Sequence, residues 1–265
     1  MNLLESTGRI TINGLAYIGG LARLGGEAAR YTFIEPFRGR PLHLDRAIHQ
    51  AMAVGVLALP ILSLITFFMG VILALQGAYE LRKFGALHYV AQAVAISMTR
   101  ELGPLMTAIV VIGRSGSAFA AEIGTMKVTE EIDALETMAL NPVQFLVTPK
   151  FLAMVVMMPL LTTWADFMGV LGGSLFGVTA AGFTVASYMR ATLDSLLLDD
   201  IYTGLIKSVM FGVVITAVGC HEGFSTGAGA EEVGRSTTAA VVMSIFLVVI
   251  VDLLFTAIFY FMSGK

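Results

Sequence analysis

Five ionisable side chains interrupt the apolar stretches of this sequence and are the first candidates for chemistry. Arg100 and Glu101 are adjacent, whereas Asp166, Lys207 and Asp252 stand alone in other stretches. A charge inside a bilayer costs several kcal/mol unless it is paired or faces water, so such residues are functional candidates. Adjacent helical residues point about 100° apart, so we expect Arg100 or Glu101 to reach another helix or a cavity. The alternative is structural pairing with the other three charges.

Nucleophilic chemistry has one candidate motif in this sequence, and metal chemistry has none. The run Gly113–Gly116 matches the Gly-x-Ser-Gly pattern of rhomboid-type intramembrane proteases, with His221 as a conceivable base. Arg114 is expected at a helix end, whereas such a protease buries its serine, which disfavours hydrolysis. No metal site is predicted, because His43, His49, His88 and His221 lack ligand spacing.

The composition is that of an integral membrane protein. Hydrophobic side chains make up 57% and charged ones 13% of 265 residues, with a mean hydropathy of +0.84, whereas soluble domains carry about 25% charged residues. The net charge of -3 provides no basic field for nucleic acid. No phosphate-binding loop is present, so any ATP must be hydrolysed by a partner, and the single Cys220 excludes an internal disulfide.

The elements that must position these residues are membrane-spanning helices. A crossing needs about 20 mostly apolar residues. Five stretches qualify, which predicts an all-α integral membrane fold with spans at about 48–79, 86–116, 151–181, 202–220 and 236–262. Pro60 predicts a tilt or kink in the first span. Gly169, Gly173 and Gly177 form a row of small residues that predicts close helix packing, within this chain or with a second copy.

The Lys and Arg distribution predicts a cytoplasmic N-terminus. The loops on one side carry ten of these residues and the loops on the other side four, and the cytoplasmic side is normally the richer one. The richer side contains Arg9, Arg23, Arg30, Arg38, Arg40, Arg46, Arg114, Lys127, Lys150 and Arg235. The poorer side contains Arg82, Lys83, Arg190 and Lys265.

Residues 1–46 are predicted to form an interfacial region that precedes the membrane domain, residues 47–265. Apolar residues such as Ile12, Leu15 and Ile18 fall on one helical face, and Arg23 lies on another. The alternative is an ordinary solvated arm.

The segment 128–140, between the second and third spans, is predicted to be a short amphipathic helix. Its apolar stripe consists of Val128, Ile132, Leu135 and Ala139. The acidic residues lie mostly off the stripe and are Glu130, Glu131, Asp133 and Glu136. A helix on an anionic membrane surface would favour Lys and Arg, so this one is expected to dock into a protein. A solvated connector is the alternative.

Long sequence runs resemble the MlaE (YrbE) family, the permeases of bacterial ABC transporters that work with MCE proteins. The runs are Arg100–Pro104, Gly113–Ser117, Ala121–Glu136, Asn141-Pro142 and Gly229–Val242. The resemblance covers the chain from about residue 40 onward.

The resemblance implies a homodimeric permease in the bacterial inner membrane. Its implied partners are two cytoplasmic ATPase subunits that hold ATP and magnesium, a STAS-domain protein and a periplasmic MCE ring. The implied function is phospholipid movement between inner and outer membranes, which maintains outer-membrane lipid asymmetry. The permease itself would be neither an enzyme nor a cofactor protein. A proton-coupled secondary transporter, and a membrane scaffold without transport, are the alternatives.

The resemblance also assigns two sets of site residues. The implied lipid cavity is lined by Leu73, Gln76, Gly77, Leu81, Phe84, Arg100 and Glu101. The segment 128–140 matches the family's coupling helix, and the residues expected to contact the ATPase are Val128, Glu130, Glu131, Ile132, Leu135 and Glu136.

Overall fold

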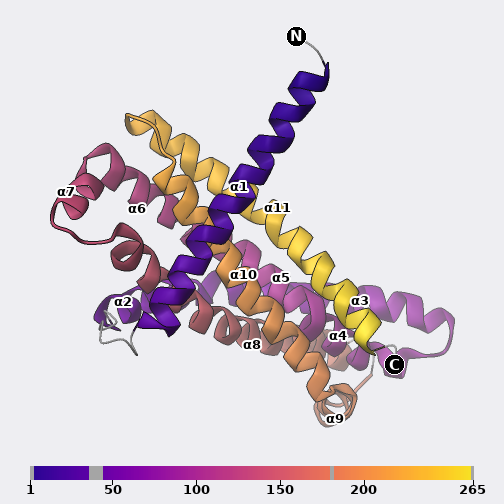
Figure 1. Cartoon of the computed structure of the whole chain (residues 1–265). Helices are drawn as coiled ribbons and strands as arrows, with labels where there is room; N and C mark the ends of the chain where they lie inside the picture. Colours follow the sequence, from indigo (N-terminus) through magenta and orange to yellow (C-terminus); the bar gives the residue numbers. More distant parts are fainter. Residues whose placement is uncertain (1–2, 36–43, 180–181, 264–265) are drawn as a thin grey trace.

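A computed structural model describes the backbone of residues 3–35, 44–179 and 182–263, and all regular structure in these ranges is helical. The α-helices in chain order are α1 (Leu3–Phe33), α2 (Leu44–Gly55), α3 (Leu59–Lys83), α4 (Val90–Ser97), α5 (Gly103–Val111), α6 (Ser117–Val128), α7 (Glu131–Thr137), α8 (Thr148–Thr179), α9 (Val185–Ser195), α10 (Leu198–Phe224) and α11 (Ala230–Ser263). Figure 1 shows an elongated bundle, with α7 and the α10–α11 connection at one end and α9 and the α3–α4 connection at the other. We call these the α7 end and the α9 end.

Five stretches of the described chain are long and apolar enough to cross a membrane, which confirms the predicted all-α membrane fold. Each extends beyond the predicted span at one end or at both, because the helices continue into their charged ends. The spans are Leu44–Lys83, Leu87–Val128, Val143–Thr179, Leu198–Phe224 and Ala230–Met262. Residues 1–2 and 36–43 of the predicted interfacial region, residues 180–181 of the predicted third span, and Lys265 lie outside the described residues.

The first span is broken between α2 and α3, where Pro60 predicts a kink. Pro60 lies in the first turn of α3, where a helix does not need the missing N–H. Arg114 of the second span donates from Nη1 to the carbonyl of Ala53 in the last turns of α2, at 2.7 Å. A long cationic side chain thereby satisfies a backbone acceptor beside the break.

The second span contains two π-helical turns, Met98–Leu102 and Ile112–Gly116. Pro104 stands two residues after the first of them, in the first turn of α5, and lacks the N–H that a regular helix would use. The carbonyl of Thr99 in this turn lies against Gly204 of α10, so closely that a Cβ at that glycine would overlap the oxygen. The widened turn carries both charged residues of the middle of this span.

Helix α8 is the centre of the bundle. Of its most apolar stretch 61% is buried, compared with 22% for the first span and 11% for the last. It packs against α2, α3, α5 and α10, and its buried Met154, Met158 and Leu161 share a core with Phe211 and Ile215 of α10. As a result, α3 and α11 leave most of their apolar surface outside the protein core.

Glycines bring the backbones of α3 and α8 into contact. A Cβ at Gly70 would overlap the carbonyl oxygen of Gly169, and a Cβ at Gly172 would overlap that of Phe67. Such close approach lets two helices gain dispersion contacts that larger residues would prevent.

The predicted row of small residues packs inside this chain. A Cβ at Gly173 would lie 2.6 Å from the Tyr188 hydroxyl of α9, and one at Gly177 would lie 2.7 Å from the ring. Gly169 also faces the Met98 side chain of the second span. The row of small residues therefore packs against the second span and α9.

Helix α1 lies across the bundle and is anchored at the α7 end (Figure 1). The Tyr17 hydroxyl donates to Oε1 of Glu222 at 2.7 Å, and its ring packs edge-on against His221 with centroids 5.0 Å apart. Burial raises the pKa of the Tyr17 hydroxyl above its usual range, and the hydrogen bond to the negatively charged Glu222 raises it further. Ile12 and Leu15 stay exposed, as expected for an amphipathic helix whose apolar face is not covered by this chain.

We expect Gly172→Ala to lower the free energy of unfolding by about 1–3 kcal/mol, because the added carbon meets backbone that cannot turn aside. Gly77→Ala is the matched control: it lies on α3 with nothing within 4 Å of its added Cβ, so stability should be unchanged or higher. Thermal unfolding in detergent measures both. Equal melting temperatures for the two variants would contradict this account of α3–α8 packing.

Candidate functional site

Arg100 and Glu101 both form ion pairs with α10. Nε of Arg100 donates to Oδ1 of Asp200, and Nζ of Lys207 donates to Oε2 of Glu101 at 2.5 Å. Two adjacent residues can reach one helix because their partners are about two turns apart along α10. Pairing with Lys207 was one of the structural alternatives, whereas Asp200 was not among the expected partners.

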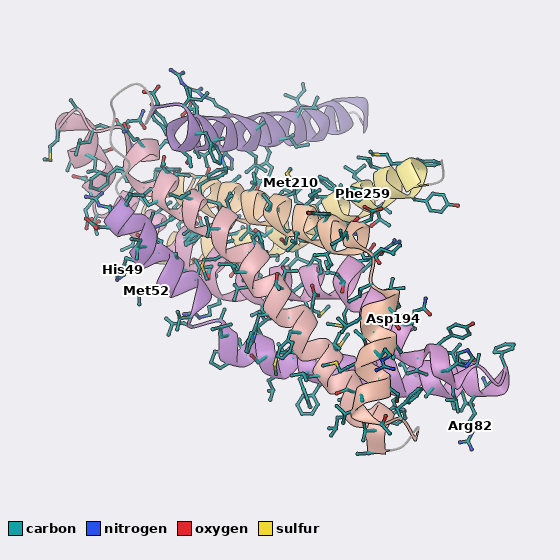
Figure 2. All side chains as sticks on the ribbon, turned by 90° about the horizontal axis from the view of Figure 1, so that it is seen from below. His49, Met52, Arg82, Asp194, Met210 and Phe259 are labelled. Atoms are coloured by element: carbon teal, nitrogen blue, oxygen red, sulfur yellow. The ribbon has the colours of Figure 1, made fainter. Side chains whose placement is uncertain are left out.

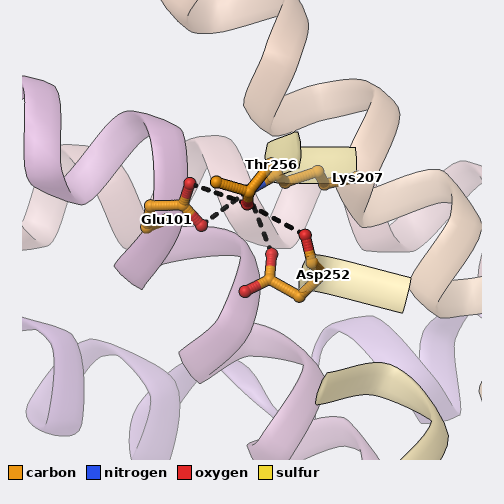
Figure 3. Close-up of polar contacts among 4 residues, drawn as sticks. All are labelled: Glu101, Lys207, Asp252 and Thr256. Carbon is orange, nitrogen blue, oxygen red and sulfur yellow. Dashed lines mark hydrogen bonds and ion pairs between the residues drawn. The ribbon is translucent and has the colours of Figure 1, made fainter. Parts of the chain in front are cut away.

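Lys207 is the centre of a four-residue network (Figure 3). Besides Glu101, its ammonium contacts the Thr256 hydroxyl at 2.8 Å and Oδ1 of Asp252 at 3.0 Å. Thr256 Oγ1 also lies 3.1 Å from Oε1 of Glu101. The network joins the second span, α10 and α11, and its one ammonium faces two carboxylates.

The Lys207 side chain is completely buried. An isolated ammonium at this depth would be strongly unfavourable, and this one is compensated by two hydrogen bonds, to Glu101 and Thr256, and by the ion pair with Asp252. Glu101 is 39% exposed, which leaves one edge of the network open to whatever lies beside it.

The neighbouring ion pair, between Arg100 and Asp200, has one buried and one partly exposed member. The Asp200 side chain is 2% exposed and the Arg100 side chain 46%. Oδ2 of Asp200 also accepts the backbone N–H of Leu197 at 3.0 Å, within the N-terminal cap of α10. The carboxylate therefore fixes Arg100 against a helix end while part of the guanidinium stays accessible.

A groove of about 320 Å³ runs beside both charged pairs. Arg100, Glu101 and Thr256 form its polar part, with Asp199 and Thr203 of α10. Phe259 and Tyr260 of α11 line the rest, and Phe259 lies toward the α9 end in Figure 2. Guanidinium, hydroxyl and aromatic groups in one groove suit a ligand that has an anionic group and an apolar body.

The five residues of α3 and its end that were expected in the lipid cavity do not line this groove in the described part of the chain. Leu73 and Leu81 pack partly buried against a small apolar cluster with the second span. Gln76 is exposed, Gly77 faces open space, and Phe84 is 80% exposed. Within a single chain, these five residues therefore do not share a groove with Arg100 and Glu101.

A second groove of about 500 Å³ lies on α3 near the α9 end. It is lined by Leu75, Ala78, Tyr79, Arg82, Leu87, Phe176 and Gly182. None of these was among the expected cavity residues, because the implied set follows a neighbouring face of the same helix.

Within the ion pairs and the network, Asp200 and Thr256 are the residues that sequence reasoning missed, and it also missed the remaining residues that line the groove. Asp200 stands at the start of its helix beside Asp199 and looks like an ordinary capping residue. Thr256 carries no charge in an apolar span, so only its spacing of one turn from Asp252 relates it to the network.

Asp166 does not join the network. Its Oδ1 is buried without a hydrogen-bond partner in the described chain, and a Cβ at Gly103 would overlap that oxygen. The buried hydroxyls of Thr107 and Thr162 are also unpartnered. They stand one turn from Gly103 and from Asp166, respectively, on helices that pack together.

The protease alternative receives no support from the position of His221. Its ring faces Gly20 and Tyr17 of α1, whereas Ser115 is buried in the second π-helical turn. Figure 1 places α1 across the outside of the bundle.

The segment expected to be the coupling helix, 128–140, is shorter than predicted. Val128 ends α6, Glu130 has a positive φ of 60°, and α7 covers only Glu131–Thr137. The single-helix prediction over 128–140 was therefore wrong at both ends, because Glu130 and Ala139 adopt positive φ angles that a right-handed helix does not contain.

The apolar stripe of this segment is used within the chain itself. Ile132 is buried and Leu135 packs partly buried against the main core. Glu130, Glu131 and Glu136 are exposed. Docking of this segment into another protein would therefore use an acidic surface, not the apolar stripe.

We expect Lys207→Met to destabilise the protein by about 3 kcal/mol or more, because it leaves Glu101 and Asp252 without their counter-charge. Adding Glu101→Gln and Asp252→Asn to the same chain should restore most of the stability, since no uncompensated charge then remains. Melting temperatures in detergent test this. A triple variant as unstable as the single one would contradict a network governed by charge balance.

Sequence comparison relates the chain to a family of permeases. The sequence model of the family described as permease MlaE matches residues 47–258. A "Probable ABC transporter permease protein" of Rickettsia felis is 39% identical over 260 residues, 98% of each chain. The "Intermembrane phospholipid transport system permease protein MlaE" of Haemophilus influenzae is 37% identical over 82% of this chain and 84% of its own length. "Protein TRIGALACTOSYLDIACYLGLYCEROL 1, chloroplastic" of Arabidopsis thaliana is 34% identical over 84% of this chain and 64% of its own. The chain, a multi-pass membrane protein, therefore belongs to the MlaE permease family.

Proposed function

We propose that this chain is the permease subunit of an ABC transporter that moves phospholipid between the inner and outer membranes of a bacterium and maintains outer-membrane lipid asymmetry. The observation that carries the proposal is a charged groove between the second span, α10 and α11 whose Arg100 is paired yet 46% exposed. The name of the Haemophilus relative supports phospholipid as the substrate.

Arg100 would bind the headgroup phosphate. A guanidinium offers two parallel N–H donors to a phosphate, and Asp200 holds this one in place from the opposite side. The acyl chains would extend over the apolar surface of α3, which carries Leu73, Leu81 and Phe84. Gln76 and Gly77 complete that surface, as the family resemblance implies.

A homodimer would bring the two parts of the cavity together. The last span buries only 11% of its most apolar stretch in this chain, and the first span 22%. Exposed side chains of α11 such as Phe246, Val249 and Leu253 face lipid or a second copy. A two-fold dimer would enclose the groove beside Arg100 and the α3 residues in one lipid cavity.

The α7 end would face the cytoplasm and the ATPase. It carries Lys127, Lys150 and Arg235, in accord with the excess of basic residues expected there. The acidic face of Glu130, Glu131 and Glu136 would contact the partner ATPase, which holds ATP and magnesium. The STAS-domain protein and the periplasmic MCE ring complete the proposed complex in the inner membrane.

Transport needs two states that bind the lipid with different affinity, since a cavity that binds equally in both moves nothing. In the proposed cycle, ATP binding by the partner shifts α7 and the helices attached to it. Lys127 links the end of α6 to the Phe224 carbonyl at the end of α10. Such a shift would reach the second span and α10, which carry Arg100 and its partner.

One observation favours the proton-coupled alternative: Asp166 has a buried carboxylate oxygen without a partner among the described residues. Carboxylates inside spans serve as proton relays in secondary transporters. Transport by the purified chain alone in a proton gradient would establish that mechanism. A requirement for the copurifying ATPase would exclude it.

We expect Glu130→Lys combined with Glu131→Lys to uncouple ATP hydrolysis from lipid transfer, because the reversed charges would repel any basic groups of the ATPase that the acidic residues contact. Asp194→Lys, an exposed change at the α9 end (Figure 2), is the matched control. The assay is lipid transfer per ATP hydrolysed by the reconstituted complex. Unchanged transfer in the double variant would remove α7 from the coupling role.

We expect Arg100→Gln to reduce copurifying phospholipid at least about tenfold, since a charge-assisted hydrogen bond contributes about 1.5–3 kcal/mol. Asp200→Asn is added so that no buried carboxylate is left unpaired. Arg190→Gln, an exposed arginine on α9, is the control. Lipid mass spectrometry of the purified protein measures the result, and equal lipid content in all variants would contradict headgroup binding by Arg100.

A further inference from the structure

A second polar cavity lies at the α7 end, where three spans meet. It is formed by the start of α2, the end of α6 and the start of the third span, and has a volume of about 280 Å³. Its polar lining consists of Arg46, His49, Gln50, Glu122 and Lys150, with the ring of Phe145. Figure 2 shows His49 and Arg82 far apart, toward opposite ends of the bundle. The cavity thus lies away from both grooves described near the α9 end.

Lys150 is a buried cation with unused donors. Its side chain is 2% exposed, and among the described residues its ammonium makes one hydrogen bond, to Oε1 of Glu122 at 2.8 Å. The Phe119 ring lies 5.3 Å away and offers only a weak cation–π contact. An ammonium has three N–H donors, and leaving donors of a buried charge unmatched is unfavourable. An additional acceptor in the cavity would match them.

Arg46 is a second cation that is already oriented. The central carbon of its guanidinium lies 3.5 Å from the centroid of the Phe145 ring. Stacking on an aromatic face holds the planar group while its N–H donors remain available. In the described part of the chain no carboxylate pairs with Arg46, since the carboxylate of the cavity, Glu122, is bound to Lys150.

The cavity therefore combines two cations with one carboxylate and has an imidazole, His49, at its edge. The excess positive charge, the planar fork of Arg46 and the unused donors of Lys150 suit a phosphate group. Glu122 keeps Lys150 in place from one side. The cavity opens where the spans begin and end, which is the level of lipid headgroups in a membrane.

We propose that this cavity binds the phosphate group of an anionic lipid headgroup from the leaflet at the α7 end. Basic pockets between membrane helices hold such headgroups in other membrane proteins. The site is independent of the transport proposal, because it uses none of the residues of the grooves near the α9 end.

The test counts phosphatidylglycerol bound to the delipidated full-length protein in neutral detergent by native mass spectrometry, with phosphatidylcholine as the zwitterionic comparison. Arg46→Gln and Lys150→Met should each weaken the binding of one phosphatidylglycerol at least tenfold. Arg46 is exposed, so its variant remains informative if Lys150→Met fails to fold. Arg235→Gln, an exposed arginine at the same end, should bind like the wild type. Lipid that binds elsewhere on the protein is the same in the wild type and the three variants, so it does not affect the difference between them.

Inorganic phosphate at millimolar concentration separates the two sources of the ligand. If both cavity variants lose phosphatidylglycerol binding, and inorganic phosphate does not displace the lipid from the wild type, the ligand is a lipid headgroup. Displacement by inorganic phosphate supports the same phosphate site with free phosphate as a second source. The proposal is overturned if Arg46→Gln binds phosphatidylglycerol like the wild type and Arg235→Gln, or if inorganic phosphate alone binds the cavity.

Discussion

An ammonium in the hydrocarbon region of a membrane must find its counter-charges within the protein, and Lys207 is the residue on which this constraint acts most strongly. Its side chain is fully buried, and the oxygen atoms that surround it come from two other spans. Three spans are therefore held at fixed distances by one side chain. Glu101 and Arg100 take their orientation from the same helix, so the charged edge of the groove follows from the way Lys207 and Asp200 are satisfied.

Close backbone packing acts on the other side of the bundle. Gly70, Gly169 and Gly172 let α3 and α8 approach until carbonyl oxygens touch the opposite helix. Because α8 fills the centre, the apolar surfaces of α3 and α11 turn outward. The same arrangement thus stabilises the bundle and leaves the surfaces that a membrane, or a second copy of the chain, can cover.

The second span links these two kinds of contact. It carries the charged pairs toward the α9 end and continues, through two π-helical turns, to α6 at the α7 end. Widened turns interrupt the regular hydrogen-bond ladder and are common at functional positions. A movement at α7 that reached α6 would act on a helix that is already irregular beside Arg100 and Glu101. The bundle thus offers a physical route between its two ends.

Much of the fold could be predicted from the sequence, because the bilayer imposes a simple rule. Any stretch of about 20 apolar residues must cross as a helix that satisfies its own backbone, and this rule found five spans and the break near Pro60. The family could also be predicted, since the runs around Arg100 and Glu131 are long. The apolar periodicity of the segment 128–140 did not predict where its helix begins and ends. The helix over 128–140 is cut short by left-handed residues at Glu130 and Ala139.

The site itself depended on the tertiary structure. The sequence marked Arg100, Glu101, Lys207 and Asp252 as costly charges, because burial of any charge needs compensation. It could not pair them, since Asp200 and Thr256 are ordinary residues until folding brings them beside the second span. The cavity of Arg46 and Lys150 likewise joins three span ends that are far apart in the chain. Residue type determines which groups need a partner, and only packing decides which partner they receive.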